Sequence, residues 1–278
     1  MDRIVITDVQ KTFQLKPGQS ISVDGRVTDR VPVLAGIDLA VRKGEFVTLV
    51  GPSGSGKSVL LDIVGGLTEA SGGEAFIDAT RVTRPDPKVA YVFQQYALFP
   101  WRTALENVEY ALEVRGVGAA ERRRKARHFL GLFGLGGFED RYPSQLSGGM
   151  QQRVAIARAL SGDPEVLLMD EPFAALDAQT RDILQSELLR IWETISTTVV
   201  FVTHSIDEAI FLADRVVVMT ARPGRVKEIV EIDLPRPRDG DVRASEAFNA
   251  YRGRVWRALR DEVQKAQKDW ALAAAFAN

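Results

Sequence analysis

Apolar residues in this chain of 278 residues gather in short runs that alternate with amphipathic stretches. The runs are rich in β-branched residues and almost uniformly apolar, as parallel strands buried on both faces of a sheet are. They cover residues 46–50, 166–169, 198–202 and 216–219, and further strands are expected at 4–9, 33–34, 37–41, 75–78 and 89–93. Helices are expected at 58–64 and 154–160, so strands and helices alternate as in α/β proteins.

Two consecutive helical stretches interrupt this alternation in the middle of the chain. Residues 105–114 and 119–133 carry apolar positions at helical spacing, and the glycine-rich residues 134–137 end the second stretch. A group of helices inside an alternating chain predicts a helical subdomain, at about 95–160, inserted in the α/β core. The basic residues 122–125 and His128 are expected on its solvent-exposed surface.

The segment that precedes the first buried strand allows two interpretations. Asp24 and Gly25 lie between short β-like runs within residues 21–27, a pattern typical of a β-hairpin. A solvent-exposed loop fits the same residues equally well. We therefore expect either a hairpin or a loop here.

The end of the chain, from Glu246 onward, has apolar residues at helical spacing. They are Phe248, Tyr251, Val255, Leu259, Val263, Ala266 and Trp270. Such a stripe predicts a helix that packs against the core of its own chain. A face for a partner protein or a regulatory contact is the alternative.

Composition excludes several classes of protein. Lys and Arg number 36 against 37 Asp and Glu, a formal charge of −1, so no basic excess is present to hold nucleic acid. Cysteine is absent, which excludes disulfides and cysteine metal sites. The N-terminus lacks the apolar core of a signal peptide, and no run of about 18 apolar residues occurs, so we expect no membrane-spanning segment. A role at a membrane would require docking to another protein.

The sequence Gly51-Pro-Ser-Gly-Ser-Gly-Lys57-Ser58 fits the pattern G-x-x-x-x-G-K-[ST] and lies between a predicted strand and a predicted helix. In this context the pattern is the P-loop, whose glycines let the backbone wrap around phosphate oxygens. Free N–H groups and the dipole at the helix start hold anionic charge. Lys57 is expected to reach the β- and γ-phosphates, and the Ser58 hydroxyl to hold Mg²⁺. The motif therefore predicts nucleotide binding.

Two carboxylates, Asp170 and Glu171, follow the buried strand 166–169. Their side chains point in opposite directions if the strand continues that far. One carboxylate for Mg²⁺ and one to polarise a water molecule is the division that nucleotide hydrolysis requires. A polar strand end without function is the alternative.

A second glycine turn, Leu146-Ser-Gly-Gly149, precedes the predicted helix 154–160 and could also bind an anion. We call residues 147–149 the signature turn. One nucleotide does not need two phosphate cradles on one subunit, so the signature turn is expected to serve a nucleotide bound by another subunit. An ordinary helix cap by Ser147 is the alternative.

These stretches together resemble the ATPase subunit of ATP-binding cassette (ABC) transporters, from about residue 4 to residue 233. The resemblance rests on the P-loop, Gln94, Leu146–Gly149, Asp170-Glu171, Ala175-Leu-Asp177 and His204, in that order. It implies a P-loop NTPase (RecA-like) α/β core with an N-terminal antiparallel β subdomain and the inserted helical subdomain. The ATPase domain would cover residues 1–240, and a C-terminal helical extension residues 241–278.

The resemblance also implies roles for individual residues. Glu171 would be the general base, His204 would hold the γ-phosphate, and Gln94 would contact Mg²⁺ and the attacking water. Metal contacts would come from Ser58, Gln94 and Asp170, and catalytic groups from Glu171, His204, Gln94 and Lys57. Contacts with ATP would come from Phe13 (stacked on adenine), Gly51, Pro52, Ser53, Gly54, Ser55, Gly56, Lys57, Ser58, Val59, Ser147, Gly148, Gly149 and Asp177. ATP and Mg²⁺ are the cofactors implied, in a head-to-tail homodimer with two ATP molecules between the subunits.

Three features depart from the family pattern. Val59 stands where a hydroxyl residue is usual, so one side-chain contact with phosphate is expected to be missing. Ala174-Ala175 replaces a small polar pair. The insertion between Phe13 and Val33 puts the adenine-stacking role of Phe13 in doubt.

The segments Tyr96-Ala-Leu-Phe-Pro-Trp101-Arg102 and Arg222-Pro-Gly-Arg225 resemble those of ATPases of nitrate, sulfonate and taurine importers. The subgroup implies import of a small anion through membrane permease subunits, with an extracytoplasmic solute-binding protein as an indirect partner. It also implies a peripheral location on the cytoplasmic face of the plasma membrane. The alternatives are an exporter or lipid-handling ATPase, a soluble ABC ATPase of ribosomes or DNA repair, and a P-loop kinase.

Overall fold

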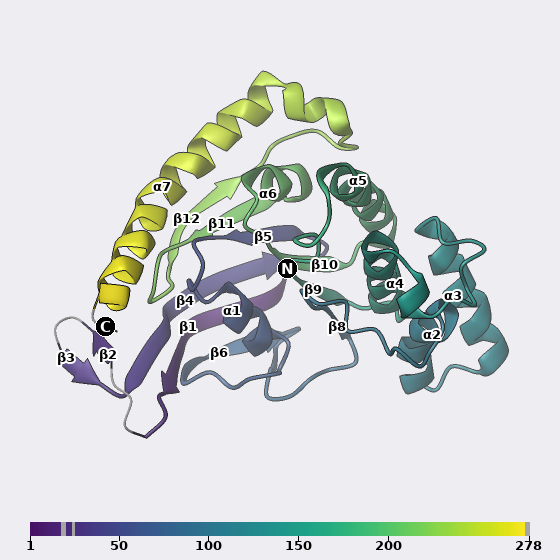
Figure 1. Ribbon diagram of the computed structural model, residues 1–278, viewed down its shortest axis with the longest axis horizontal. Helices are drawn as coiled ribbons and strands as arrows, with labels where there is room; N and C mark the ends of the chain where they lie inside the picture. The colour runs from purple at the N-terminus through teal and green to yellow at the C-terminus, as the bar shows by residue number, and fades with distance from the viewer. Residues whose placement is uncertain (18–20, 24–25, 276–278) are drawn as a thin grey trace.

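The computed structural model describes residues 1–17, 21–23 and 26–275. Its larger sheet has six strands in the order β12-β11-β5-β10-β9-β8 (Figure 1). Their bounds are β5 Phe46–Val50, β8 Val89–Val92, β9 Val166–Asp170, β10 Thr198–Val202, β11 Arg215–Met219 and β12 Val226–Glu231. All neighbours are parallel except β11 and β12. Every residue of β5 and β10 is buried, which confirms that the uniformly apolar runs form parallel strands covered on both faces.

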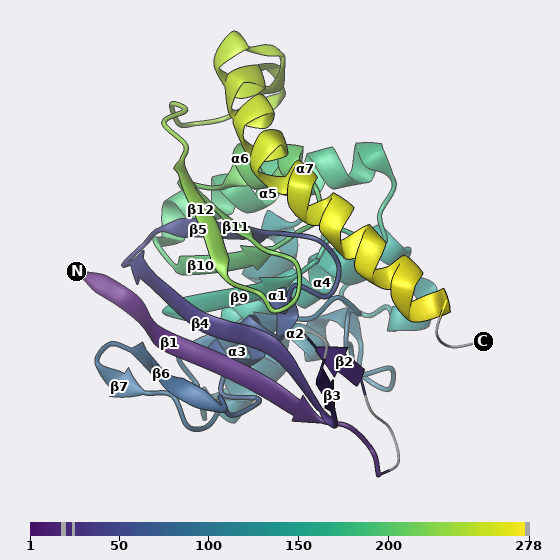
Figure 2. The same cartoon turned by 90° about the vertical axis from the view of Figure 1, so that its left-hand side faces the viewer.

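A smaller antiparallel sheet has the strand order β4-β1-β6-β7. Its strands are β1 Asp2–Gln14, β4 Arg30–Arg42, β6 Gly72–Ile77 and β7 Thr80–Arg81. The predicted strands 33–34 and 37–41 belong to the single strand β4. β1 pairs with β4 along its length, although the register of the pairing shifts at several points. Figure 2 shows this sheet beside the larger one, as the expected N-terminal antiparallel β subdomain.

The insertion contains a hairpin of β2 Ile21–Val23 and β3 Arg26–Thr28, which pair antiparallel. The structure therefore decides between the hairpin and the loop in favour of the hairpin. The expected turn residues Asp24 and Gly25 lie outside the described residues.

Seven α-helices cover the two sheets in the described part of the chain. They are α1 Lys57–Val64, α2 Ala104–Val114, α3 Ala119–Leu132, α4 Gly148–Ser161, α5 Ala178–Ile195, α6 Ile206–Leu212 and α7 Glu246–Ala275. Two 3₁₀ turns, Pro143–Gln145 and Gly240–Ala244, precede α4 and α7. α5 was not among the predicted elements, although its buried residues Leu184, Leu188 and Ile191 repeat at helical spacing.

Helix α1 lies between the two sheets. Its buried residues Leu60, Leu61, Ile63 and Val64 belong to one apolar cluster with side chains from both sheets. The opposite face of the larger sheet contacts α5, α6 and the helical layer α2–α4, and these form the second apolar cluster. Figure 1 shows α2, α3 and α4 together at one end of the molecule, as an inserted helical subdomain requires. The domain boundaries at 95, 160 and 240 stay a prediction.

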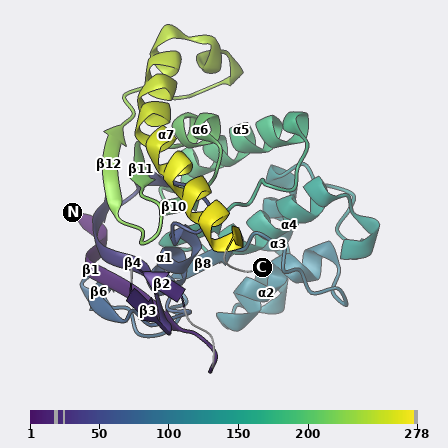
Figure 3. The same cartoon turned by 60° about the vertical axis from the view of Figure 1, so that its left-hand side comes forward.

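Helix α7 packs along α6, β11 and β12 (Figure 3). In Figure 1 it lies on the side of the molecule opposite the helical layer. Phe248 and Val255 are fully buried and Leu259 is nearly so, which confirms that this part of the stripe packs on the chain's own core. The side chain of Trp270 lies outside the described part of the structure. None of the helices, as far as they are described, combines the length and the apolar character needed to cross a bilayer.

Candidate nucleotide site

The P-loop leaves the end of β5 at Val50 and enters α1 at Lys57. Gly56 has φ 86°, a left-handed conformation that side chains strongly disfavour. A side-chain carbon placed on Gly56 would also lie 2.6 Å from Cδ2 of Leu34 in β4. β4 of the smaller sheet therefore packs directly against the P-loop, and only glycine fits at this contact.

The Lys57 ammonium is buried and turned into the P-loop. It donates to the carbonyl oxygens of Gly51 (2.9 Å) and Pro52 (3.1 Å) and to Oγ of Ser55 (3.3 Å). Burial lowers the pKa of Lys57 from its ordinary 10.5 to about 8, and the negative charges of Glu171 and Asp170 oppose part of this effect. The ammonium is therefore charged at neutral pH, but the nearby carboxylates offset only part of the cost of burying its charge. A bound anionic phosphate would offset more of that cost.

Ser58 and Asp170 form the part of the site suited to a metal ion. The Ser58 hydroxyl donates to Oδ1 of Asp170 over 3.0 Å, and burial raises the pKa of Asp170. Mg²⁺ prefers such hard oxygen donors and is usually held by one or two protein groups together with phosphates and water. The described residues contain no group of three or more His, Asp or Glu side chains that could hold a metal ion. The oxygens of Ser58 and Asp170 have the chemistry that Mg²⁺ prefers, so this pair could hold a metal ion bound with a nucleotide.

Glu171 and His204 face each other across the ends of β9 and β10. Nε2 of His204 lies 2.6 Å from Oε1 of Glu171, and this hydrogen bond lowers the pKa of Glu171. β9 ends at Asp170, and Glu171 takes a left-handed conformation with φ 45°. The strand therefore does not continue to Glu171, so the condition for alternating side chains is not met, and this turn separates the two carboxylates instead. Such strained backbone is frequent at functional sites.

The signature turn begins α4, and Ser147 caps the helix by accepting from the amide of Met150 over 3.3 Å. Cβ atoms built on Gly148 and Gly149 would lie 2.9 Å from the Tyr96 hydroxyl oxygen and 2.8 Å from Cγ2 of Thr180. Asp177 caps α5 by accepting from the amide of Thr180 over 3.0 Å, and this hydrogen bond lowers the pKa of Asp177. The structure thus brings the signature turn and the Asp177 loop into one cluster.

The P-loop and the signature turn occupy different layers of one chain. α1 packs on β6, β9 and β10, whereas α4 packs on α2, α3 and β8 (Figure 1). The first layer gathers Lys57, Ser58, Asp170, Glu171 and His204 around the carboxyl ends of the parallel strands. This arrangement agrees with the expectation that the signature turn serves another subunit.

Phe13 and Gln94 lie at the margins of the site. Phe13, near the end of β1, is 43% exposed and pairs with Val31 of β4. Nζ of Lys11 lies 5.0 Å from the centroid of the Phe13 ring. Val33 of the neighbouring strand β4 lies against the P-loop at Gly56. Gln94 is exposed after β8 and makes no hydrogen bond with a side chain or backbone group of the described residues.

Sequence reasoning missed the groups that hold the segment after Gln94. Arg158 of α4 donates to the carbonyl oxygens of Ala97 (2.7 Å) and Tyr96 (3.2 Å). Asn107 of α2 is fully buried and binds both backbone groups of Phe99. The sequence did contain a signal for Asn107, since it is a polar residue on the apolar face of a predicted helix and a buried amide needs hydrogen-bond partners.

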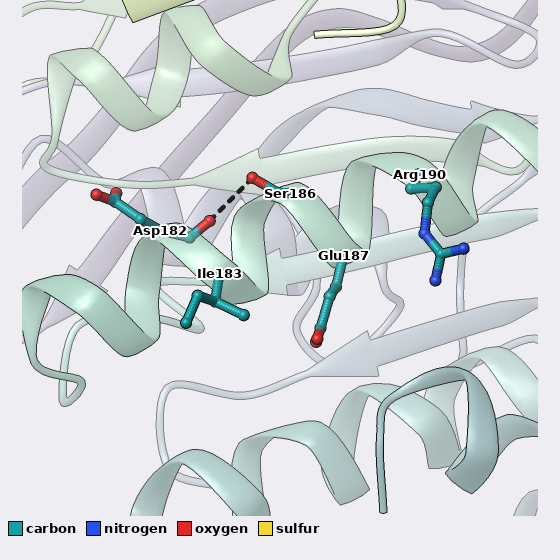
Figure 4. Close-up of a pocket in the computed structure, with 5 residues that line it drawn as sticks. All are labelled: Asp182, Ile183, Ser186, Glu187 and Arg190. Atoms are coloured by element: carbon teal, nitrogen blue, oxygen red, sulfur yellow. Dashed lines mark hydrogen bonds between the residues drawn. The ribbon is translucent and has the colours of Figure 1, made fainter. Parts of the chain in front are cut away.

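A surface hollow lies along one face of α5 (Figure 4). It is lined by Asp182, Ile183, Ser186, Glu187 and Arg190, and it is shallow and open. No group with a nucleotide role lines it.

A lysine buried in a P-loop, a Ser–Asp oxygen pair and an ionised carboxylate beside a histidine are typical of P-loop nucleotide hydrolases. Residues 34–174 match the family model described as ABC transporter. The chain belongs to the ATP-binding subunits of ABC transporters, which are ATPases.

Known relatives resemble this chain over most of its length. An uncharacterized ABC transporter ATP-binding protein of Methanocaldococcus jannaschii is 57% identical over 240 residues, 86% of this chain and 89% of the relative. The aliphatic sulfonates import ATP-binding protein SsuB of Bacillus cereus is 47% identical over 242 residues, 85% and 94% of the two chains. A dimeric ATP-binding cassette solved with ADP and Pi has a TM-score of 0.71 at 35% identity, covering 84% of this chain and all of that cassette.

The buried ammonium of Lys57 predicts a pH-dependent stability of the nucleotide-free chain. Between about pH 8 and pH 10.5 the unfolded chain holds a proton that folded Lys57 has lost. The free energy of unfolding should therefore rise with pH across this window, by on the order of 2–3 kcal/mol from this residue. In urea denaturation Lys57→Met should lack this part of the rise, whereas Lys43→Met, at an exposed lysine, should retain it. Equal pH slopes for all three proteins would contradict the interpretation.

Proposed function

We propose that this chain is the ATP-hydrolysing subunit that powers import of a small anion through a membrane permease. The observation that supports it most directly is the Glu171–His204 pair beside the P-loop, because it supplies an ionised carboxylate for a water molecule. The nitrate, alkanesulfonate or taurine class of solute is favoured. The sulfonate import relatives and the segments 96–102 and 222–225 support this choice.

ATP binding would use both sheets. The P-loop amides and Lys57 would hold the β- and γ-phosphates, and the ring of Phe13 would stack on adenine. Ser58 and Asp170, together with Gln94, would hold Mg²⁺, which supplies charge neutralisation between the β- and γ-phosphates. Val59 offers only its backbone amide to phosphate.

Hydrolysis would follow from the positions of Glu171 and His204. Glu171 accepts a proton from a water molecule as the water oxygen forms a bond with the γ-phosphorus. The bond between that phosphorus and the bridging oxygen breaks, and ADP leaves with its electron pair. Nε2 of His204 holds the Glu171 carboxylate at 2.6 Å, and in the proposed cycle it would donate to a γ-phosphate oxygen once ATP is bound.

A second copy of the chain would complete each site. Its signature turn, residues 147–149, would meet the γ-phosphate held by the first copy, and Asp177 would shape the contact between copies. The separation of P-loop and signature turn within one chain supports this head-to-tail homodimer. The dimeric relative with ADP and Pi supports it as well.

The permease would dock on the segment that follows Gln94. The segment exposes Trp101 at 71%, and Phe93, just before Gln94, is exposed at 41%. Arg158 and Asn107 hold the segment on the helical layer. The Tyr96 hydroxyl of the same segment lies against Gly148 of the signature turn. A movement of the docked segment would therefore reach the turn that is proposed to contact ATP. The subunit would therefore sit on the cytoplasmic face of the plasma membrane, with a solute-binding protein on the other side.

Replacing Glu171 by Gln tests the general base. The amide cannot take a proton from water, so ATP hydrolysis should fall by about 100- to 10,000-fold while ATP affinity stays close to the parent value. Phosphate release by the subunit bound to its permease and calorimetric ATP titration measure the two quantities. Glu69→Gln, at an exposed loop, is the matched control and should hydrolyse normally. Parent-like turnover by Glu171→Gln would refute this role.

The dimer can be tested by light scattering in the hydrolysis-deficient Glu171→Gln chain. With Mg-ATP this chain should double in mass, because both nucleotides remain between the copies. Adding Ser147→Arg should keep it monomeric, since the exposed Ser147 would be replaced by a bulky cation at the contact. Ser186→Arg, in the hollow of α5, should still dimerise. Dimerisation despite Ser147→Arg would exclude the proposed contact.

Direction of transport and solute can be tested with the reconstituted transporter. Copurification of the chain with a polytopic permease should be followed by ATPase assays in vesicles with a solute-binding protein and nitrate, an alkanesulfonate or taurine. An importer of this class should respond to the loaded binding protein, because the loaded form favours one state of the coupled assembly. Stimulation by an internal substrate without any binding protein would instead indicate an exporter.

A further inference from the structure

The turn between β11 and β12, residues 220–225, touches the P-loop directly. A Cβ atom built on Gly224 would lie 2.0 Å from the carbonyl oxygen of Ser55, so only glycine allows this approach. The amide of Gly224 donates to Val33 (2.8 Å), and its carbonyl accepts from Ala35 (3.1 Å). The turn is therefore joined both to the P-loop and to β4 behind it.

This turn carries Arg222 to the rim of the P-loop. Nη2 of Arg222 would lie 3.2 Å from a Cβ atom on Gly54, which places the guanidinium against the middle of the loop. Arg222 is exposed, and within the described part of the chain it forms no hydrogen bond and no ion pair. Its donors thus face the P-loop without a protein acceptor to satisfy them.

The turn is held firmly enough to position that guanidinium. The Thr220 hydroxyl donates to Pro223 (3.0 Å) and accepts from the amide of Arg225 (2.9 Å). From the other side, Glu262 of α7 accepts from the amide of Ala221 (2.9 Å) and from Lys227 (2.7 Å). The order of the backbone reduces the entropy that Arg222 would lose when it binds an anion.

We propose that Arg222 is a phosphate-binding residue of the nucleotide site, donating from its guanidinium to a phosphate oxygen of ATP. The inference rests on the proposed function of the P-loop and adds a cation that the motif itself does not contain. A guanidinium presents a planar fork of donors that suits phosphate oxygens, and its charge-assisted hydrogen bonds are stronger than neutral ones. Arg222 also comes from a strand hairpin distant in sequence from the loop that it serves.

Calorimetric titration of the full-length chain with Mg-ATP, and separately with adenosine, tests this role. Arg222→Ala should bind Mg-ATP about fivefold more weakly, since one exposed charge-assisted contact is lost. Arg222→Lys should recover part of the affinity, and adenosine affinity should not change. Arg225→Ala is the matched control, because its guanidinium lies near Gly36 of β4 rather than near Gly54.

The outcomes separate this inference from the proposed function. Loss of Mg-ATP affinity in Arg222→Ala but not in Arg225→Ala supports the phosphate contact. Parent-like affinity in Arg222→Ala, or an equal loss in Arg225→Ala, overturns it. A Lys57→Ala chain measured alongside shows whether the Arg222 contact alone or the P-loop function itself is wrong. If it loses affinity and Arg222→Ala does not, only the Arg222 contact is wrong; if neither loses affinity, the P-loop function itself is wrong.

Discussion

Burial of α1 between two sheets is the packing constraint on which the nucleotide site depends. Its apolar residues contact both sheets, so the helix start at Lys57 is held in place. The fully buried strand β5 fixes the other end of the P-loop at Val50. Because both ends are anchored in the core, the loop between them is held in the left-handed conformations at Gly54 and Gly56, which glycine adopts readily and other residues do not.

The same sheet brings the remaining catalytic groups to this loop. β9 and β10 run parallel beside each other, so Asp170 and His204 emerge at one edge. The left-handed turn at Glu171 redirects the next carboxylate toward His204. The helical layer instead carries the signature turn and the exposed segment after Gln94. One chain therefore places these groups in two separate layers, and Tyr96 and Thr180 lie against the glycines of the signature turn.

Much of this arrangement could be predicted from the sequence, because its signals are local. The apolar runs predicted the buried strands, and the glycine motifs predicted the turns that begin α1 and α4. Contacts between distant segments had no such signal. The hydrogen bond of Glu171 with His204 depends on the end of β9, and the support of the P-loop by Leu34 and Gly224 depends on how two sheets and a hairpin meet. α5 did carry a local signal in the helical spacing of its buried residues Leu184, Leu188 and Ile191.

Helix α7 has a consequence for how this protein is handled in the laboratory. Glu262 reaches back to the amide of Ala221 and to Lys227, so a segment near the end of the chain braces a turn that touches the P-loop. Trimming the chain before Glu262 to obtain a smaller ATPase fragment would free that turn. Labels are better attached at Met1, whose side chain is fully exposed, so that the brace is left untouched.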